Sequence, residues 1–485
     1  MMNLGIMFEE SCQRYRERVA LIHDSKKTTY GELNRQINAL GTHLKGLGLK
    51  QGDKIALMLP NCPEFVIAYM AAQKIGCVAL TLNVMSTAYE LLHFLENSDS
   101  KAFITVASSA KRFHEIQDRV PLCRHLILTD GSAESPFWKI TGHESDRLEP
   151  SQVDLQDPAA MIYTSGLTGK PLGAVLTHGN LLHQSSLLSR IAHGDENDRA
   201  LAVIPYFHSF GASANMLAIL RAGASVVLLE RFTLDTIFST IEQEKVTYIA
   251  AVPRLFLGMI FHNKADAYKT DSIRMCITGG SAMQTDIFPL FEQKFNVKLQ
   301  EGYGLTEASP ICALSRIEMP QKYGSIGLPI PDVEARIVDE QGKELPREVV
   351  GELIIRGPNV MQGYYKDPAA TAQVIKNGWL YTSDLARIDE DGYIFLTGRK
   401  KRMVITSGFN VYPREVELVL EMHPGVKTSH VVSVPDLMRG EIVKALIVKK
   451  QDATVDDREL LKHCRAYLSS YKIPREIEFV EAIVD

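Results

Sequence analysis

The chain has 485 residues, of which 45% are hydrophobic and 23% are charged, and its formal net charge at pH 7 is −5. This length predicts two or more domains, and the composition is that of a soluble globular protein. The acidic balance gives no electrostatic reason to expect a nucleic-acid partner. No run of 18 apolar residues occurs, so we expect no membrane span, while peripheral membrane contact stays open.

The seven cysteines are scattered, with no C-x-x-C and no paired spacing. This pattern is typical of reduced thiols, so we expect a cytoplasmic protein. Glu9 and Glu10 occur before any apolar core of signal-peptide length could form, so no secretion signal is expected.

Up to about residue 325, expected helices alternate with expected strands. Helices are predicted over residues 7–19, 29–47, 64–75 and 90–97, and another begins after Ser213. Strands are predicted over residues 54–59, 76–82, 101–105, 159–163, 200–204, 225–229, 248–252 and 275–278, and an apolar run occupies residues 174–176. Parallel strands covered by helices produce this alternation, so the prediction is an α/β fold with helix-covered parallel sheets.

The pattern changes after about residue 325. Strands predicted over residues 335–338, 351–356 and 392–396 indicate a β-rich subdomain over residues 325–399. The charge run Arg399-Lys400-Lys401-Arg402 then precedes a small α/β unit, with helices expected over 413–422 and 457–468 and strands over 428–434 and 443–449. We therefore predict an N-terminal domain over residues 1–399 and a small C-terminal domain over residues 400–485.

A glycine-rich stretch follows the strand expected over residues 159–163. It reads Tyr163-Thr164-Ser165-Gly166-Leu167-Thr168-Gly169-Lys170-Pro171-Leu172-Gly173. Glycines let backbone N–H groups approach a ligand, and consecutive N–H groups with hydroxyls form an anion-binding nest. The stretch predicts a polyphosphate loop, with a surface turn as the alternative. Its residue order matches neither Walker A nor Gly-x-Gly-x-x-Gly.

A second motif reads Gln300-Glu301-Gly302-Tyr303-Gly304-Leu305-Thr306-Glu307. An aromatic ring between glycines can lie flat against a planar ligand such as adenine. A hydroxyl can meet a phosphate, and a hard carboxylate suits Mg²⁺. The alternative is a strand–turn–helix junction in which Thr306 and Glu307 act as caps.

Two shorter motifs also carry polar groups beside aromatic residues. The first of these motifs reads Trp379-Leu380-Tyr381-Thr382-Ser383-Asp384 and ends in a carboxylate, which is a common acceptor for the two ribose hydroxyls. The alternative is an aspartate in an ordinary turn. The second motif reads Pro205-Tyr206-Phe207-His208-Ser209-Phe210-Gly211 and places a histidine among aromatic rings. A histidine in such surroundings is more often packed in the core than part of a functional site.

In order and spacing, these motifs resemble those of the adenylate-forming superfamily, which includes acyl-CoA synthetases, firefly luciferase and peptide-synthetase adenylation domains. The family's loop usually reads Tyr-Thr-Ser-Gly-Thr-Thr-Gly-x-Pro-Lys-Gly, from which this chain departs at Leu167 and Leu172. The resemblance covers almost the whole chain. It implies a mobile C-terminal domain, and Mg²⁺, ATP and coenzyme A as cofactors and cosubstrates.

The resemblance also assigns roles to individual residues. It implies that Tyr303 contacts adenine, Thr306 a phosphate, Asp384 the ribose and Arg399 the ribose or α-phosphate. The full set implied to bind ATP or CoA is Thr164, Ser165, Gly166, Thr168, Gly169, Lys170, Gly280, Ser281, Ala282, Glu301, Gly302, Tyr303, Gly304, Thr306, Asp384, Arg399, Lys401 and Gly408.

Further implied roles concern the metal and the conformational change. Thr164 and Glu307 are the implied metal ligands, and the implied catalytic residues are His208, Thr306, Glu307 and Lys401. His208 would act as a gate between the nucleotide and acyl pockets, and Lys401 as the hinge, although Arg402 stands where the family often has Asp. Gly408 would leave room for the pantetheine arm of CoA.

The segments that match the family's acyl pocket contain few charges. Arg254, Glu301 and Glu307 are the charged residues in ranges 205–215, 251–256, 278–283 and 301–309. This favours an uncharged tail. Gly211 occupies the position of an Asp that pairs the ammonium group in amino-acid-activating relatives, and a buried ammonium without a partner is costly. Small residues at 279, 280 and 282 leave room for a longer chain, so we expect a medium- or long-chain fatty acid, with an aryl acid as the alternative.

The implied reaction has two steps: a carboxylate and ATP give an acyl-adenylate and pyrophosphate, and the thiol of CoA then displaces AMP. Tyr471-Lys472-Ile473-Pro474 matches the start of the family's last motif, but the printed chain stops at Asp485, before the family's lysine. Together with Leu172, this predicts slow adenylation and retained transfer to CoA. The alternatives are an adenylation enzyme that loads a carrier protein and an impaired nucleotide- or acyl-binding homologue.

Overall fold

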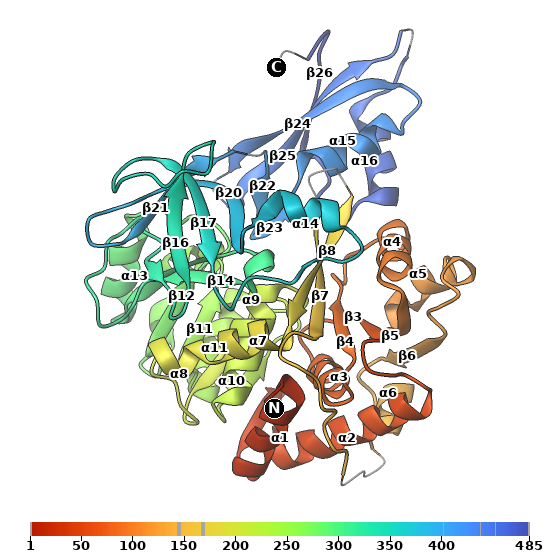
Figure 1. Ribbon diagram of the computed structural model, residues 1–485, viewed down its shortest axis with the longest axis vertical. Helices are drawn as coiled ribbons and strands as arrows, with labels where there is room; N and C mark the ends of the chain where they lie inside the picture. The colour runs from red at the N-terminus through yellow and green to blue at the C-terminus, as the bar shows by residue number, and fades with distance from the viewer. Residues whose placement is uncertain are drawn as a thin grey trace.

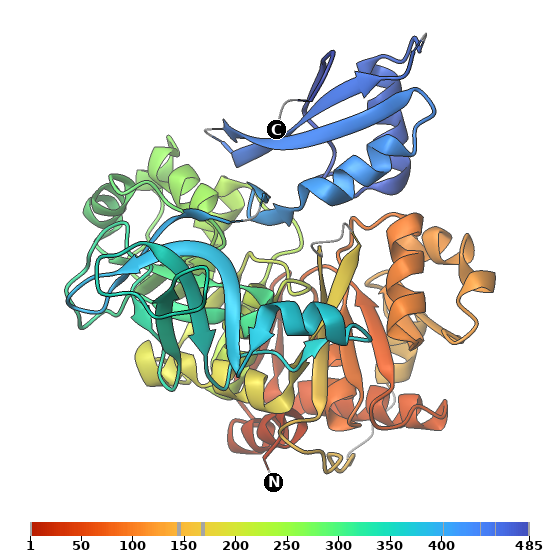
Figure 2. The same cartoon turned by 45° about the horizontal axis from the view of Figure 1, so that its top comes forward.

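The computed structural model describes residues 2–142, 147–165, 170–400, 402–436, 438–451 and 453–483. Two large sheets with their helices stand side by side, and the C-terminal part of the chain, residues 402–483, lies across one end of both (Figures 1 and 2). The predicted α/β fold class, with helix-covered parallel sheets and a β-rich region, is confirmed. None of the described helices has the length and apolar character that a bilayer crossing requires.

The first large sheet has seven strands in the order β18-β8-β7-β4-β3-β5-β6. The run from β7 to β6 is parallel, and β8 and β18 add an antiparallel edge. The strands are β3 (Lys54–Met58), β4 (Val78–Thr81), β5 (Ser100–Val106), β6 (His125–Thr129), β7 (Pro158–Ser165), β8 (Pro171–Thr177) and β18 (Gly363–Tyr364).

The second large sheet has nine strands in the order β15-β14-β13-β12-β11-β9-β10-β1-β2. Its centre from β13 to β1 is parallel, and both edges are antiparallel. The strands are β1 (Val19–His23), β2 (Lys26–Thr29), β9 (Arg199–Ala202), β10 (Ser225–Leu228), β11 (Tyr248–Ala251), β12 (Met275–Thr278), β13 (Leu299–Gly304), β14 (Ile311–Leu314) and β15 (Leu328–Pro329).

Helices cover these sheets on the faces that carry apolar residues. They are α1 (Leu4–Arg14), α2 (Tyr30–Gly46), α3 (Pro63–Lys74), α4 (Ala88–Ser98), α5 (Ala110–His114), α6 (Pro136–Thr141), α7 (His178–Ser185), α8 (Leu187–Ile191), α9 (Ser209–Ala212), α10 (Ala218–Arg221), α11 (Leu234–Glu244), α12 (Pro253–Phe261) and α13 (Ile287–Phe295). A π-helical segment, Ser213–Leu217, joins α9 to α10.

Two predicted helix boundaries were wrong. The helix expected over residues 7–19 is α1, which begins three residues earlier and ends at Arg14. Asn3 caps its start, where its side chain accepts a hydrogen bond from the Ile6 N–H. Val19 instead begins β1 and pairs with Thr29. The helix expected after Ser213 already begins at Ser209.

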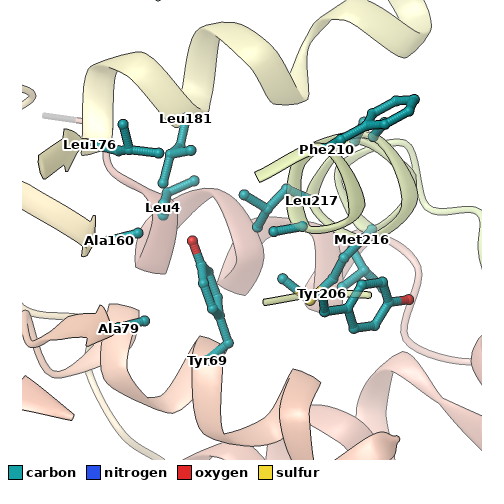
Figure 3. Packing of buried hydrophobic residues seen from close by; sticks show 14 of the residues in the cluster. Leu4, Tyr69, Ala79, Ala160, Leu176, Leu181, Tyr206, Phe210, Met216 and Leu217 are labelled. Carbon is teal, nitrogen blue, oxygen red and sulfur yellow. The ribbon is translucent and has the colours of Figure 1, made fainter. Parts of the chain in front are cut away.

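The main hydrophobic core lies between the two large sheets. Figure 3 shows residues from several elements meeting there, including Leu4 of α1, Tyr69 of α3, Ala160 of β7 and Phe210 of α9. Tyr206 is fully buried in this core, and its hydroxyl donates to the Asn215 carbonyl. The core therefore fixes the segment that leads into α9.

A third, β-rich region follows the second sheet. It has the strand order β16-β17-β20-β19, and β21 pairs with β20. Helix α14 (Pro368–Val374) lies in the same region. The strands are β16 (Glu334–Val338), β17 (Gly351–Arg356), β19 (Ile375–Lys376), β20 (Trp379–Ile388) and β21 (Ile394–Arg399).

The C-terminal part forms a separate sheet with its own hydrophobic cluster. The strand order is β23-β22-β25-β24, and β26 pairs in parallel with β25. Buried side chains such as Val416 and Leu460 fill the space between this sheet and its helices. The elements are β22 (Val404–Thr406), β23 (Phe409–Val411), α15 (Pro413–Glu421), β24 (Val426–Asp436), β25 (Gly440–Lys449), α16 (Asp457–Tyr467) and β26 (Glu476–Phe479).

Candidate active site

A cavity of about 770 Å³ lies where the carboxyl ends of β7 and β13 meet the β-rich region and the turn between β22 and β23. In open α/β sheets ligands bind at this end of the strands. The cavity wall contains the following predicted site residues: Thr164, His208, Gly280, Ser281, Ala282, Glu301, Gly302, Tyr303, Gly304, Thr306, Glu307, Asp384, Arg399 and Gly408.

Of the remaining predicted site residues, the structure describes Ser165 and Lys170. Ser165 is the last residue of β7. Lys170 is exposed and does not line the cavity. The predictions for Gly166, Thr168, Gly169 and Lys401 fall outside the described residues.

The predicted metal ligands Thr164 and Glu307 contact each other. The Thr164 hydroxyl donates to Glu307 Oε1 at 3.1 Å, and the hydroxyl of Tyr364 donates to the same oxygen at 2.8 Å. Burial, reinforced by the charge of Glu307, raises the pKa of Tyr364, so its hydroxyl stays a donor. Tyr364 was missed from the sequence because its place depends on β18 pairing with β8.

Asp384 lies in β20 and accepts two hydrogen bonds from other predicted site residues. The Tyr303 hydroxyl donates to Oδ2 at 2.5 Å, and Arg399 Nε donates to Oδ1 at 3.0 Å. Ser383 has a φ of +63°, and its N–H donates to Glu352, a β17 residue that the sequence did not single out. This strained residue, held by Glu352, turns the Asp384 carboxylate toward the cavity.

His208 stands at the start of α9 and lines the cavity wall. Its Nδ1 accepts a hydrogen bond from the Phe210 N–H at 3.2 Å, so in the neutral ring Nε2 carries the proton. Burial lowers the pKa of His208 to about 4. The imidazole is therefore neutral at physiological pH, as suits a steric gate or hydrogen-bond donor rather than a cation.

Glu301 is 7% exposed, and burial raises the pKa of its carboxyl to about 7, opposed by a hydrogen bond from the Met283 backbone. Its Oε2 has no hydrogen-bond partner among the described residues. A buried acceptor of this kind needs a donor, which an exocyclic amino group of a bound base would supply.

Among the described residues, the cavity offers hydroxyl groups for a phosphate but no ready-made metal site. Thr306 Oγ1 lies 3.3 Å from Ser209 Oγ, which places two hydroxyls at the base of α9. Across the described ranges, no three His, Cys, Asp or Glu side chains gather to hold a metal ion. A cation at Glu307 would thus be completed by substrate oxygens and water, as is usual for Mg²⁺.

Gly408 brings the C-terminal part against the cavity. Its φ is +84°, and a Cβ added there would lie 2.6 Å from Cγ1 of Val252. The next residue, Phe409, stacks on Phe207 with ring centroids 6.3 Å apart. Backbone of the C-terminal part therefore reaches the wall that also holds His208.

Comparison with known proteins gives consistent matches along the chain. The AMP-binding enzyme family matches residues 8–365, and its C-terminal domain matches residues 415–484. The long-chain-fatty-acid–CoA ligase of Bacillus subtilis is 32% identical over 508 residues, covering 98% of this chain and 90% of that protein. The feruloyl-CoA synthase of an Amycolatopsis species is 32% identical over 465 residues, covering 96% of this chain and 92% of that protein.

Solved structures also match over the full length. The amide bond synthetase McbA from Marinactinospora thermotolerans has a TM-score of 0.91 at 27% identity, covering 100% of this chain and 96% of that one. The Bacillus subtilis o-succinylbenzoate CoA synthetase, bound with its product analogue, scores 0.88 at 28% identity, covering 99% and 95%. ATP-bound MatB from Rhodopseudomonas palustris scores 0.77 at 29% identity, covering 100% and 96%. The chain belongs to the AMP-binding enzyme family, and within it to the AMP-forming acid–thiol ligases of the acyl-CoA synthetase type, which use ATP and CoA.

Proposed function

We propose that this protein is a cytoplasmic acyl-CoA synthetase that activates a medium- or long-chain fatty acid. The carboxylate attacks the α-phosphorus of ATP, so that pyrophosphate leaves and an acyl-adenylate forms. The sulfur of CoA then attacks the acyl carbon, its thiol proton is lost, and AMP leaves. Both nucleophiles are competent, so the protein contributes mainly positioning and charge stabilisation.

The observation that carries this proposal is the continuity of one cavity. It joins Glu307 and Asp384, which suit a nucleotide, to Gly408 of the C-terminal part and to an apolar section. Tyr303 would lie against adenine, Asp384 would accept from the ribose hydroxyls, and Arg399 would neutralise charge nearby. Glu301 Oε2, which has no hydrogen-bond partner within the described ranges, fits the adenine amino group.

Thr164 and Glu307 would hold Mg²⁺ together with phosphate oxygens. When bound, the ion would neutralise charge on the leaving pyrophosphate. The hydroxyls of Thr164 and Tyr364 orient the Glu307 carboxylate toward this position.

We further propose a domain boundary near residue 400, about which the C-terminal part rotates between the two steps. The contact of Gly408 with the cavity supports assigning the present orientation to the thiol step.

The apolar section of the cavity favours an aliphatic tail. It includes Phe210, Ile277, Leu314 and Ile326. A Cβ at Gly211 would lie 2.3 Å from the Pro205 carbonyl oxygen, so the backbone leaves no room for the carboxylate that would pair an amino-acid substrate. The similarity to a feruloyl-CoA synthase keeps an aryl acid as the second candidate.

A panel of acids tests the substrate proposal. With ATP, Mg²⁺ and CoA, pyrophosphate and thioester formation should rise about fourfold in kcat/KM per added methylene until the cavity is full, since each buried methylene contributes about 0.8 kcal/mol. Ferulate or benzoate outperforming every fatty acid would instead establish the aryl alternative. Thioester formed on a carrier protein but not on CoA would identify a carrier-loading enzyme, and no pyrophosphate with any acid would indicate a binding homologue.

Glu301 predicts a pH dependence of ATP use. Its carboxyl has a pKa of about 7, so it ionises as pH rises from 6 to 8.5. Oε2 is buried before ATP binds, so adenine adds little further desolvation and mainly donates a hydrogen bond. This bond is about 1 kcal/mol stronger to a carboxylate than to a neutral acid. The KM for ATP should therefore fall about fivefold across this range in wild type.

Glu301→Gln is the matched control for that prediction, because the amide keeps the shape and an acceptor but cannot ionise. ATP itself ionises in this pH range and affects both proteins equally, so the two KM profiles are compared after correction for that effect. The KM of Glu301→Gln for ATP should then stay near the low-pH wild-type value at every pH. If the KM of Glu301→Gln for ATP fell with pH as it does in wild type, this role of Glu301 would be contradicted.

Leu172 predicts a gain of activity on substitution. It is the cross-strand partner of Thr164 between β8 and β7, so its side chain lies on the face that bears Thr164. Leu172→Lys should raise the rate of pyrophosphate release about tenfold, because an ammonium there would stabilise the polyphosphate. Leu172→Met, of similar size and uncharged, should leave the rate unchanged; an equal gain in both variants would rule out the charge explanation.

A further inference from the structure

The contact between α4 and the C-terminal part contains a buried ion cluster. Lys472 Nζ donates to Glu90 Oε1 of α4 at 2.8 Å and to Glu415 Oε1 of α15 at 2.6 Å. The Ser469 hydroxyl donates to Glu90 Oε2 at 2.7 Å. The side chains of Lys472 and Glu90 are each 5% exposed, and that of Glu415 is 7% exposed. In Figure 1, α4 lies next to α16, the helix that precedes Ser469.

Glu90 and Lys472 are both ionised despite their burial. Burial alone would raise the pKa of Glu90, but the charge and hydrogen bond of Lys472 lower it overall. Burial would lower the pKa of Lys472, but Glu415 and Glu90 raise it well above its usual value. Removing the Glu90 charge would break the pair that links α4 to Lys472 and leave Lys472 paired only with Glu415 of the C-terminal part.

Lys472–Glu90 is the only ion pair between residues 2–400 and 402–483 in the described part of the chain. Glu90 is itself held by α4, because it forms the capping box with Thr87 at the start of that helix. The Thr87 hydroxyl also donates to the Tyr467 carbonyl at 3.2 Å. The start of α4 thus forms a well-ordered binding surface, called the α4 dock below, for the segment 467–472.

The α4 dock is connected to the cavity through stacked rings. Tyr471, next to Lys472, stacks on Phe409 with ring centroids 4.7 Å apart, and Phe409 stacks on Phe207. Phe409 follows Gly408 and Phe207 precedes His208, so both ends of the stack adjoin predicted site residues. A second cavity of about 100 Å³, lined by Lys472, Tyr471, Phe409 and His208, lies along this path.

We propose that Lys472 and Glu90 are positioning residues for thioester formation: their ion pair holds the C-terminal part in the orientation that brings Gly408 to the cavity, and acyl-adenylate formation does not require it. This rests on the proposed function. In the orientation that forms the adenylate, the C-terminal part is rotated and the pair is broken, so its loss affects one step only.

The test compares the two half-reactions in Glu90→Gln. The amide keeps the size and an acceptor for the capping box, but removes the charge that pairs with Lys472. Conversion of a supplied acyl-adenylate and CoA to thioester should fall about 10- to 100-fold. Pyrophosphate release from acid and ATP should change less than about threefold. Lys472→Arg, which keeps the charge, should retain more thioester formation than Lys472→Met.

Glu9→Gln is the matched control. Glu9 pairs with Lys74, a fully buried lysine, but both lie in the N-terminal part. This variant should not separate the two half-reactions. An equal loss of both half-reactions in Glu90→Gln, or no loss of thioester formation, would overturn the proposal.

A measurement independent of activity separates this proposal from the proposed function. Spin labels at two exposed residues, Glu115 directly after α5 and Arg458 in α16, report the distance between the N-terminal and C-terminal parts. The wild-type distribution should be narrow, and that of Glu90→Gln should broaden or shift. If wild type makes no thioester, the proposed function fails, while the distance still tests the ion pair. An unchanged distribution in Glu90→Gln would overturn the positioning role.

Discussion

Glu307→Gln is expected to slow pyrophosphate release about 10²- to 10³-fold, the loss typical of removing one preorganised charge-stabilising group. The amide oxygen can still accept from Thr164 and Tyr364, the two donors that meet at Oε1. The backbone carbonyl of Glu307 keeps its bond from the Met361 N–H. The fold should therefore persist, and the loss should reflect the missing negative charge that would hold Mg²⁺.

A magnesium titration separates this explanation from a general loss of activity. The half-saturating Mg²⁺ concentration for pyrophosphate release should rise at least about tenfold in Glu307→Gln, since the ion would lose the carboxylate that Glu307 supplies. Tyr364→Phe keeps the carboxylate but loses the hydrogen bond that orients it, so its rate should fall only about three- to tenfold. An unchanged magnesium requirement in Glu307→Gln would contradict a metal role for this residue.

Much of the fold could be predicted because parallel strands buried on both faces read as apolar runs. The runs at 54–59, 248–252 and 275–278 correspond to β3, β11 and β12. Helix ends were harder, as α1 shows: its start depends on the Asn3 side chain, and the strand that follows depends on pairing with Thr29. Such choices are decided by hydrogen bonds that hydrophobic periodicity does not report.

The candidate site was predictable where its residues form local motifs. The structure brings Tyr303, Glu307 and Asp384 to one cavity, although their roles stay predictions. What remained hidden depends on contacts between distant segments. Tyr364 meets Glu307 across 57 positions, and Lys472 meets Glu90 across 382. No spacing pattern in a single sequence encodes such a pair, because the fold alone brings the partners together.

Gly408→Ala is expected to slow thioester formation much more than pyrophosphate release. The added Cβ would lie 2.6 Å from Cγ1 of Val252, a contact that exists only while the C-terminal part faces the cavity. Overpacking of this kind costs about 1–3 kcal/mol, so conversion of acyl-adenylate and CoA to thioester should fall about 10- to 100-fold. Pyrophosphate release, which proceeds in the other proposed orientation, should change less than about threefold.

The companion variant Val252→Ala makes this prediction specific, because it removes the methyl group that the new Cβ would meet. Relief of the overpacking should raise thioester formation at least about fivefold in Gly408→Ala/Val252→Ala relative to Gly408→Ala. The remaining loss is the strain of alanine at a φ of +84°, which is about 1–2 kcal/mol. Gly392→Ala carries the same kind of strain, at a φ of +90°, with its nearest contact an ordinary 3.6 Å from Leu328. It should leave the ratio of the two half-reactions unchanged. A double variant as slow as Gly408→Ala would show that backbone strain, not the contact with Val252, controls the thiol step.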